Sequence, residues 1–458
     1  MTSNPAIGSD RNASSGNPRH EVDRFVAAFN LYNGNQLNGQ SKRVRSLREA
    51  AIESFRALGF PGTKSEAWKY TPIARAVSAD FRIDLSEAPN SHVAVNVEAL
   101  RVPNLESIVV VMIDGVYSTD LSDADFPVGL TVTSLRAAMV EHADIVDAHL
   151  GAYCDTNQEA FEALNTAFLR DGVFIHLGEG IELDRPVEVL SLNSGRNRAF
   201  SQPRVLVVAE ANSRLTLVEQ QRSVADADDS AETFGNTVVE ISAARHARID
   251  HYRLQLENTG SSHVCTTRIY QREASEVSTF TATLGGKLVR NNLHILPDAE
   301  QCLTHLSGIF VGRANQHIDN HTLVDHAKPN CESNELYKGI LDDESTGVFN
   351  GKVFVRRDAQ KTNAYQSNKT VILSDNARMF AKPELEIYAD DVKCSHGATT
   401  GQLDDEGLFY LQTRGVSRER AKVMMLQAFA GDALQQIRPA AVRAYVEQLV
   451  SDRIESAP

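Results

Sequence analysis

Apolar positions recur with helical spacing near the start of the chain. One stripe occupies positions i, i+3, i+4 and i+7 with Val22, Phe25, Val26 and Phe29. A second stripe has the same spacing and joins Val44, Leu47, Ala51, Phe55 and Leu58. Gly59 and Pro61 follow it and are typical of a helix end. We therefore predict a helical N-terminal region over residues 21–100.

The residues before the first stripe are polar and rich in Ser and Asn. They contain no hydrophobic segment of the kind that a signal peptide requires. We predict a disordered tail over residues 1–20 and no export.

From about residue 172 to 400 the pattern changes to short, β-branched runs that are separated by polar turns. Helical periodicity is nearly absent there, which favours strands. The expected turns lie at residues 211–213, 243–247, 273–275, 298–300, 358–360 and 375–377. Upstream, Ile108–Ile113 predicts a buried strand, Asp114-Gly115 a turn, and residues 134–170 a helical stretch.

Many short strands in sequence can form a sandwich, a propeller or a solenoid. Two-residue hairpin signals are few, and Asn350-Gly351 is the clearest of them. We therefore favour a β-solenoid core over residues 101–400 with a mixed initial segment, and the fold class is mainly β.

Helical periodicity returns in the last part, residues 401–458. Ser417 is a typical N-cap, and Pro439 is placed to begin a further helix whose apolar residues keep strict helical spacing. An earlier short helix follows Asp404 and ends at Gly415. These three helices need a surface to pack against, which is either the end of the β core or a partner protein.

Composition narrows the function. The chain has 458 residues with 46 basic and 60 acidic side chains, a net charge of −14, which argues against binding to nucleic acid or anionic membranes. Its longest apolar run, Ile108–Ile113, is too short to span a bilayer. Five scattered cysteines without a CxxC pair argue against disulfides and zinc fingers. A cytoplasmic protein is the simplest interpretation.

No nucleotide-binding motif is present. The pairs Gly286-Lys287 and Gly351-Lys352 are followed by Leu and Val, where a phosphate-binding loop needs Ser or Thr. Gly178 and Gly180 lack the third glycine of a dinucleotide fingerprint. We expect this chain to bind no nucleotide.

A histidine cluster and a group of aspartates are weak candidates for a metal site and for a glycosidase site. In a strand, His317 and His321 would share one face and His326 the other, which speaks against a common metal. Paired carboxylates could serve glycoside chemistry, which β-solenoids often host, although turn capping is the simpler role; the candidates are Asp319, Asp325, Asp342 and Asp343. A secreted-type β-helix polysaccharide hydrolase or lyase is thus an alternative function.

Cys394 and His396 form the most suggestive pair. Residues at i and i+2 of a strand project to the same face, so a thiolate and an imidazole could reach one metal or sulfur species. Lys393 and a protonated His396 would also lower the pKa of the Cys394 thiol. The other interpretation is that Cys394 is a small buried hydrophobic residue.

At these residues the sequence resembles the SufB/SufD family of iron–sulfur cluster assembly proteins. The resemblance is strongest in LEIYADDVKCSHGATTGQLDDEGLFYLQTRGVSRERAKVMMLQAFAGD (385–432), ELYKGILDDESTGVFNGKVFVRRDAQKTNAYQSNKTVILS (335–374), GGKLVRNNLHILPDAEQCLTHLSG (285–308) and GFPGTKSEAWKYTPI (59–73). The KSEAWKYTP and KCSHGAT segments are more similar to the SufD branch than to SufB. Within this match we interpret Trp68 as a packing residue.

The resemblance implies a right-handed parallel β-helix flanked by helical N- and C-terminal regions. It also implies a SufB-like paralogue that pairs at the C-terminal end of the β-helix, and a SufC-like ATPase that docks on the C-terminal helices. By the same resemblance, His396 matches a histidine associated with nascent clusters, and Cys394 aligns with the assembly cysteine of the paralogue. Cys331 lies in a family-like stretch and is kept as a core residue.

The hypothesis is a non-catalytic scaffold subunit that holds a transient iron–sulfur cluster with its SufB-like partner, using Cys394 and His396, while ATPase activity resides in a separate chain. An alternative within the family is a purely structural partner of SufB that provides no cluster ligands. In isolation the chain could form a homodimer, because the end of a β-helix leaves strand edges unpaired.

Overall fold

The computed structural model describes residues 18–35, 41–77, 81–83, 95–196, 198–224 and 231–455. The tail expected over residues 1–20 lies outside this range except for its last three residues, which begin helix α1 (Pro18–Asn35). The N-terminal part also contains α2 (Lys42–Leu58), the short 3₁₀ helix Glu66–Trp68, α3 (Ile73–Val77), β1 (Arg82–Ile83) and α4 (Val97–Leu100).

Helix α2 begins and ends where its apolar stripe does. The Ser41 hydroxyl accepts a hydrogen bond from the Val44 N–H (3.2 Å), which caps the first turn. At the other end Gly59 has φ +64°, and its N–H donates to the Phe55 carbonyl (2.8 Å). The predicted second helix is therefore confirmed.

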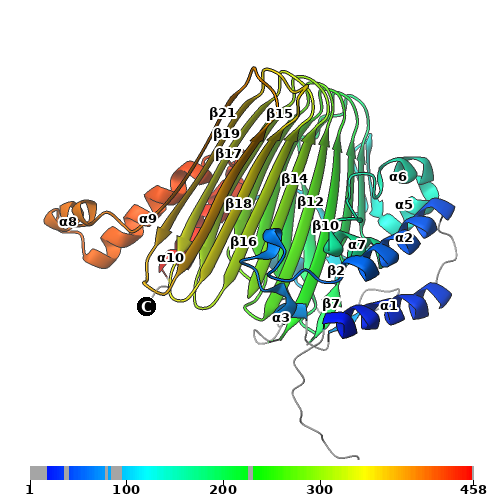
Figure 1. Cartoon of the computed structure of the whole chain (residues 1–458), viewed down its shortest axis with the longest axis horizontal. Coiled ribbons are helices and arrows are strands. Elements are labelled where there is room, and N and C mark those ends of the chain that lie inside the picture. The colour runs from blue at the N-terminus through cyan, green and yellow to red at the C-terminus, as the bar shows by residue number, and fades with distance from the viewer. Residues whose placement is uncertain are drawn as a thin grey trace, which may run out of the picture.

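The core is a parallel β-solenoid of about eight turns, made of two sheets that face each other (Figure 1). Sheet A contains β4 (Leu130–Ser134), β5 (Val173–Leu177), β8 (Arg204–Ala209), β10 (Thr233–Ala243), β12 (Ser261–Gln271), β14 (Leu288–Pro297), β16 (His317–His326), β18 (Thr346–Val355) and β20 (Arg378–Ile387), with β7 (Ala199–Ser201) and β1 beside it. Sheet B contains β3 (Val116–Tyr117), β2 (Ile108–Ile113), β6 (Val187–Asn193), β9 (Arg214–Ser223), β11 (Arg248–Leu256), β13 (Glu276–Thr283), β15 (Leu303–Gly312), β17 (Glu332–Leu341), β19 (Asn363–Ile372) and β21 (Lys393–Gly401).

Inward-facing residues of successive turns stack in register. Leu293, for example, pairs with Thr322, and Thr322 with Gly351. The six polar stretches predicted as turns lie between consecutive strands of the two sheets. Stacked apolar residues fill most of the interior between the sheets, and so the solenoid and mainly-β predictions are confirmed.

Two local predictions need correction. Residues 134–170 form three separate helices, α5 (Leu135–Glu141), α6 (Ala143–His149) and α7 (Ala160–Ala167), instead of one stretch. Asn350-Gly351 makes no hairpin, because both residues lie inside the parallel strand β18. A glycine is instead needed at position 351 for lack of space, since a Cβ there would collide with the Gln366 amide.

In the described part of the chain three helices follow the solenoid, and the last two of them pack on the outer face of sheet B. The three helices are α8 (Asp405–Thr413), α9 (Arg418–Leu434), capped by Ser417 as predicted, and α10 (Ala440–Glu455). Helices α9 and α10 bury apolar residues against Tyr252, Ile309 and Ile340, among others. The Lys338 ammonium anchors α9 by donating to Asp432 (2.7 Å) and to the Phe429 carbonyl (2.6 Å). Helix α8 projects beyond the solenoid (Figure 1).

A segment of the N-terminal region crosses the outer face of sheet A, where it contacts β14 to β20. The Arg290 guanidinium lies over the Trp68 ring at 3.8 Å and donates to the Ala67 carbonyl (2.7 Å). The Tyr70 ring stacks on Phe380 of β20. Trp68 is buried, and this confirms its packing role.

The two ends of the solenoid differ. At the N-terminal end, helices α5 and α6 cover the outer side of the first turns with apolar residues such as Leu135 and Met139. At the C-terminal end, β20 and β21 are the terminal strands of their sheets. Every residue of these two strands is at least partly exposed. We call this C-terminal end, formed by β20 and β21, the open end.

Candidate functional site at the open end

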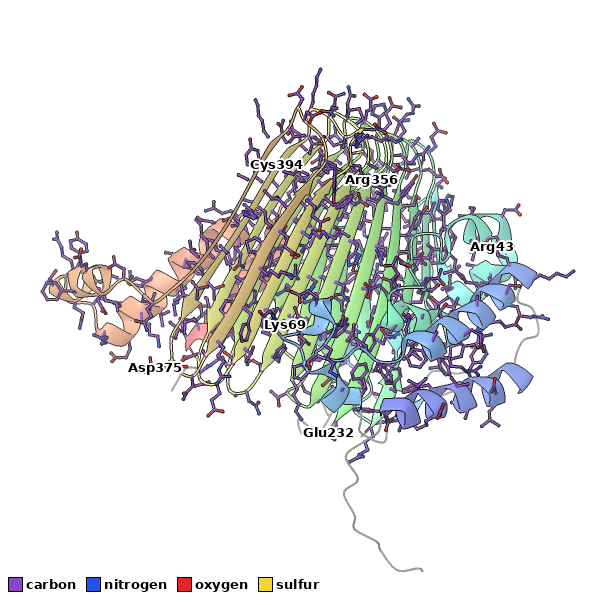
Figure 2. All side chains as sticks on the ribbon, viewed as in Figure 1. Arg43, Lys69, Glu232, Arg356, Asp375 and Cys394 are labelled. Carbon is purple, nitrogen blue, oxygen red and sulfur yellow. The ribbon has the colours of Figure 1, made fainter. Side chains whose placement is uncertain are left out.

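Cys394 and His396 both lie on β21 at the open end. They pair in register with Ala364 and Gln366, which are buried and face the interior of the solenoid. By this register both side chains fall on the interior-facing side of β21, as strand alternation predicts. Figure 2 labels Cys394 on this last strand, far from Arg43 of the N-terminal helices.

The two side chains have different surroundings. Cys394 is half-buried and packs against a small apolar cluster that includes Val353, Ala364 and Ala389. Burial raises the pKa of the Cys394 thiol, although a backbone hydrogen bond from Ala364 opposes the shift. The expected lowering of this pKa by Lys393 and His396 is therefore wrong, because desolvation dominates. His396 is exposed.

Beneath His396 the interior is polar. The Gln366 amide donates to the Glu335 carboxylate (2.8 Å), and the Thr322 hydroxyl donates to the other carboxylate oxygen (2.6 Å). Burial raises the pKa of Glu335 to about 7, and these two hydrogen bonds offset only part of the effect. Sequence reasoning missed Glu335 and Gln366, since their only signal is the register of neighbouring turns.

The chain matches two family descriptions that together cover most of its length. Residues 23–189 match the SufBD protein N-terminal region, and residues 191–429 match the SUF system FeS cluster assembly, SufBD core domain. The chain belongs to the SufBD family. Its role therefore lies in iron–sulfur cluster assembly.

Curated relatives of this SufBD chain match it nearly end to end. An iron–sulfur cluster assembly SufBD family protein of Synechocystis is 32% identical, with 89% of this chain and 90% of the relative covered. The proteins named SufD of Escherichia coli and Bacillus subtilis are 29% and 25% identical, covering 88% and 89% of this chain and 91% and 92% of their own. The resemblance to SufD drawn from the sequence is confirmed.

The histidine-rich strand of this SufBD protein is structural in its contacts. His317 contacts the Thr71 hydroxyl (3.0 Å) and His321 the Asp319 carboxylate (3.0 Å), both on the outer face, whereas His326 points inward to Ser333 (2.9 Å). The predicted division between two faces is confirmed. Across the described ranges, no three His, Cys, Asp or Glu side chains are grouped to hold a metal ion.

Two other cysteines come together that the sequence keeps apart. Cys302 and Cys331 precede neighbouring strands of sheet B, and both thiols donate to the Ala299 carbonyl (3.2 Å each). Hydrogen bonding to Cys302 lowers the pKa of the Cys331 thiol and outweighs burial, which raises it. Both residues are fully buried, in line with the core role expected for Cys331.

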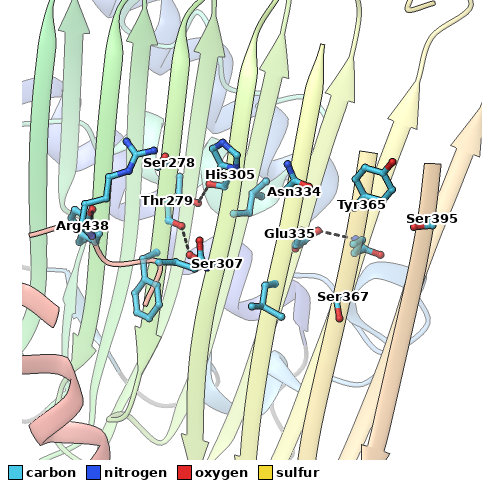
Figure 3. A pocket seen from close by; sticks show the side chains of 16 residues that line it. Ser278, Thr279, His305, Ser307, Asn334, Glu335, Tyr365, Ser367, Ser395 and Arg438 are labelled. Carbon is cyan, nitrogen blue, oxygen red and sulfur yellow. Dashed lines mark hydrogen bonds between the residues drawn. The ribbon is translucent and has the colours of Figure 1, made fainter. Parts of the chain in front are cut away.

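A groove of about 460 Å³ lies on the outer face of sheet B between the open end and the segment that joins α9 to α10 (Figure 3). Hydroxyl, amide and imidazole groups dominate its lining, among them Ser278, His305, Asn334, Tyr365 and Ser395. Its one carboxylate residue, Glu335, turns its side chain to the interior. In the part of the chain described here, the groove thus lacks the paired carboxylates of a glycosidase.

None of the helices in the described ranges has the length and apolar character needed to cross a lipid bilayer.

Proposed function

We propose that this chain is a non-catalytic scaffold subunit of a cytoplasmic SUF complex. In this role it pairs with a SufB-like paralogue at the open end, and the two chains hold a nascent iron–sulfur cluster between them as cargo. The observation that carries the proposal is the position of Cys394 and His396, a thiol and an imidazole on the interior-facing side of the terminal strand of sheet B. Thiolate and imidazole are ordinary ligands of iron.

The open end has the chemistry of an interface. The last strands present unpaired backbone groups together with the apolar side chains of Leu385 and Ile387, and Val392 lies between the two strands. Such an edge is a template for strand pairing with another chain. A second solenoid end of the same kind would cover both the edges and the half-buried Cys394. The SufB-like paralogue is the proposed occupant, and a second copy of this chain replaces it in isolation.

The C-terminal helices are the proposed docking surface for a SufC-like ATPase. Helix α8 exposes 69% of Phe409 and 57% of Tyr410, an unusual display of aromatic surface. A cavity of about 520 Å³ lies between these helices and the outer edge of sheet B, lined by Leu403, Leu408 and Val423 among others. Nucleotide binding by the ATPase would move these helices and thereby open the paired solenoid ends.

Co-expression with both partners tests this assignment of surfaces. We expect Ile387→Asp to release the SufB-like chain but keep the ATPase, and Phe409→Ser/Tyr410→Ser to do the reverse. Val128→Asp is the matched control, because Val128 is an exposed apolar residue next to β4, at the opposite end of sheet A from β20. Size-exclusion chromatography with light scattering measures the complexes. A wild-type chain that stays monomeric beside both partners would contradict the proposal.

A further inference from the structure

The inward positions of the last turns form one column that leads to the open end. Leu306, Glu335, Gln366 and His396 pair in register on β15, β17, β19 and β21. The column thus passes from an apolar residue to a carboxylate, an amide and an imidazole, in that order. Figure 3 shows the hydrogen bond between Glu335 and the Gln366 amide, next to the terminal strand that bears Ser395.

The hydrogen bonds of Glu335 fix the orientation of Gln366. The Gln366 NH₂ group donates to Glu335 Oε2, which turns the amide oxygen away from Glu335. Thr322, from the opposite sheet, holds the second carboxylate oxygen. The missing side chain of Gly351 leaves the space that the Gln366 amide fills. The Glu335 hydrogen bond and the space at Gly351 therefore hold the amide in this orientation.

This orientation leaves the other end of the amide unused. The Gln366 side chain is only 3% exposed, and its buried Oε1 atom has no hydrogen-bond partner among the described residues. A buried carbonyl without a donor is costly, and native structures usually provide a donor for it. In register, the next side chain of the column beyond Gln366 is that of His396.

We propose that the Glu335–Gln366 pair positions His396 for its ligand role. A rotation of the exposed His396 side chain brings its Nδ1–H to Gln366 Oε1, and the Nε2 lone pair is thereby left free and directed out of the open end. Metal-binding histidines commonly donate their second N–H to a carboxylate or a carbonyl, which fixes the tautomer and the ring orientation. This inference rests on the proposed function, since it takes His396 as the group that meets the cargo.

Nitrogen NMR of the full chain labelled with ¹⁵N-histidine tests the hydrogen bond without any metal. The His396 signals are assigned by their absence in His396→Ala. We expect the Nδ1–H tautomer to dominate in the wild type and the Nε2–H tautomer in Gln366→Leu. Asn368→Leu is the matched control, because Asn368 is the next buried inward amide of β19 and pairs with Ala398 instead; it should leave His396 unchanged.

A swapped pair provides the rescue. Glu335→Gln/Gln366→Glu exchanges the amide and the carboxylate and again places an acceptor beside His396, so it should restore the Nδ1–H tautomer. The inference is overturned if wild type and Gln366→Leu share one tautomer, or if Asn368→Leu shifts it equally.

Anaerobic iron and sulfide reconstitution of the complex separates this inference from the proposed function. We expect Gln366→Leu to weaken iron retention about 10-fold or more, the usual effect of removing such a support. If His396→Ala retains iron like the wild type, the proposed function fails, whatever the tautomer. If His396→Ala loses iron while Gln366→Leu retains it, only the positioning role fails.

Discussion

Replacing Asp319 with alanine is expected to lower the free energy of unfolding by about 3–5 kcal/mol. Asp319 is fully buried, and its carboxylate receives the Arg290 guanidinium (2.9 Å) and the Thr71 hydroxyl (2.5 Å), with His321 at 3.0 Å. Burial alone would raise the pKa of Asp319, but His321 and Arg290 outweigh it and hold the pKa well below its ordinary value. Removing the carboxylate leaves the Arg290 charge buried and uncompensated.

Asp319→Ala should also loosen the contact between the outer face of sheet A and the N-terminal segment that contains Trp68. Arg290 holds this segment through Trp68 and the Ala67 carbonyl, so the tryptophan fluorescence of Asp319→Ala should report greater exposure. Asp325→Ala is the control on the same strand. It removes a carboxylate paired with the half-exposed Arg356 (2.7 Å) and should change the unfolding free energy by no more than about 1 kcal/mol. Equal midpoints of urea unfolding for the two variants would contradict this account.

Replacing Glu335 with glutamine should stabilise the chain at pH 8. The folded-state pKa of Glu335, about 7, lies above the unfolded value of about 4.5, so the folded chain retains this proton longer as pH rises. Ionisation of Glu335 therefore leaves the free energy of unfolding unchanged below pH 4.5 and lowers it progressively between pH 4.5 and 7. Above pH 7 the free energy of unfolding stays at the lower value. The difference corresponds to about 3 kcal/mol, at 1.36 kcal/mol per pKa unit. Glutamine cannot ionise and avoids this loss.

Urea unfolding of both chains at several pH values between 5 and 8 measures the effect. The stability difference between Glu335→Gln and the wild type should grow with pH up to about 7 and then stay constant. Glu332→Gln, at an exposed position of the same strand, should show no such trend. A constant difference between Glu335→Gln and the wild type would show that Glu335 ionises as it does in water. A buried carboxyl group that destabilises the protein at neutral pH is typical of a functional site. The position of Glu335 beneath His396 agrees with this.

Local patterns predicted the elements well. The Ser417 cap, the Gly59 helix end and the Ile108–Ile113 strand lie where the sequence predicts them, because each depends on neighbours in sequence. Strand alternation likewise predicted that Cys394 and His396 share a face. The recurrence of short β-branched runs favoured a solenoid, and the family resemblance implied that its strands are parallel.

Contacts between successive turns could not be predicted. The Cys302–Cys331 pair, the Glu335–Gln366 hydrogen bond and the Trp68–Arg290 contact each join residues far apart in sequence, and their meeting depends on the register of the solenoid. The turns of this solenoid differ in length, so a fixed repeat does not reveal the register. The register also explains why Asn350-Gly351 resembled a hairpin signal. Gly351 lies opposite Gln366 of another turn and leaves the space for its amide.

The central claim is that His396 is a ligand of the nascent cluster. Its most direct test is the absorbance spectrum of the co-purified complex after anaerobic reconstitution with iron and sulfide. His396→Ala is compared with wild type and with His305→Ala, which removes a histidine from the outer groove of sheet B. The account predicts that His396→Ala loses or alters the charge-transfer bands of the cluster while His305→Ala matches the wild type, all three complexes having the same composition. A His396→Ala complex with the wild-type spectrum would contradict it.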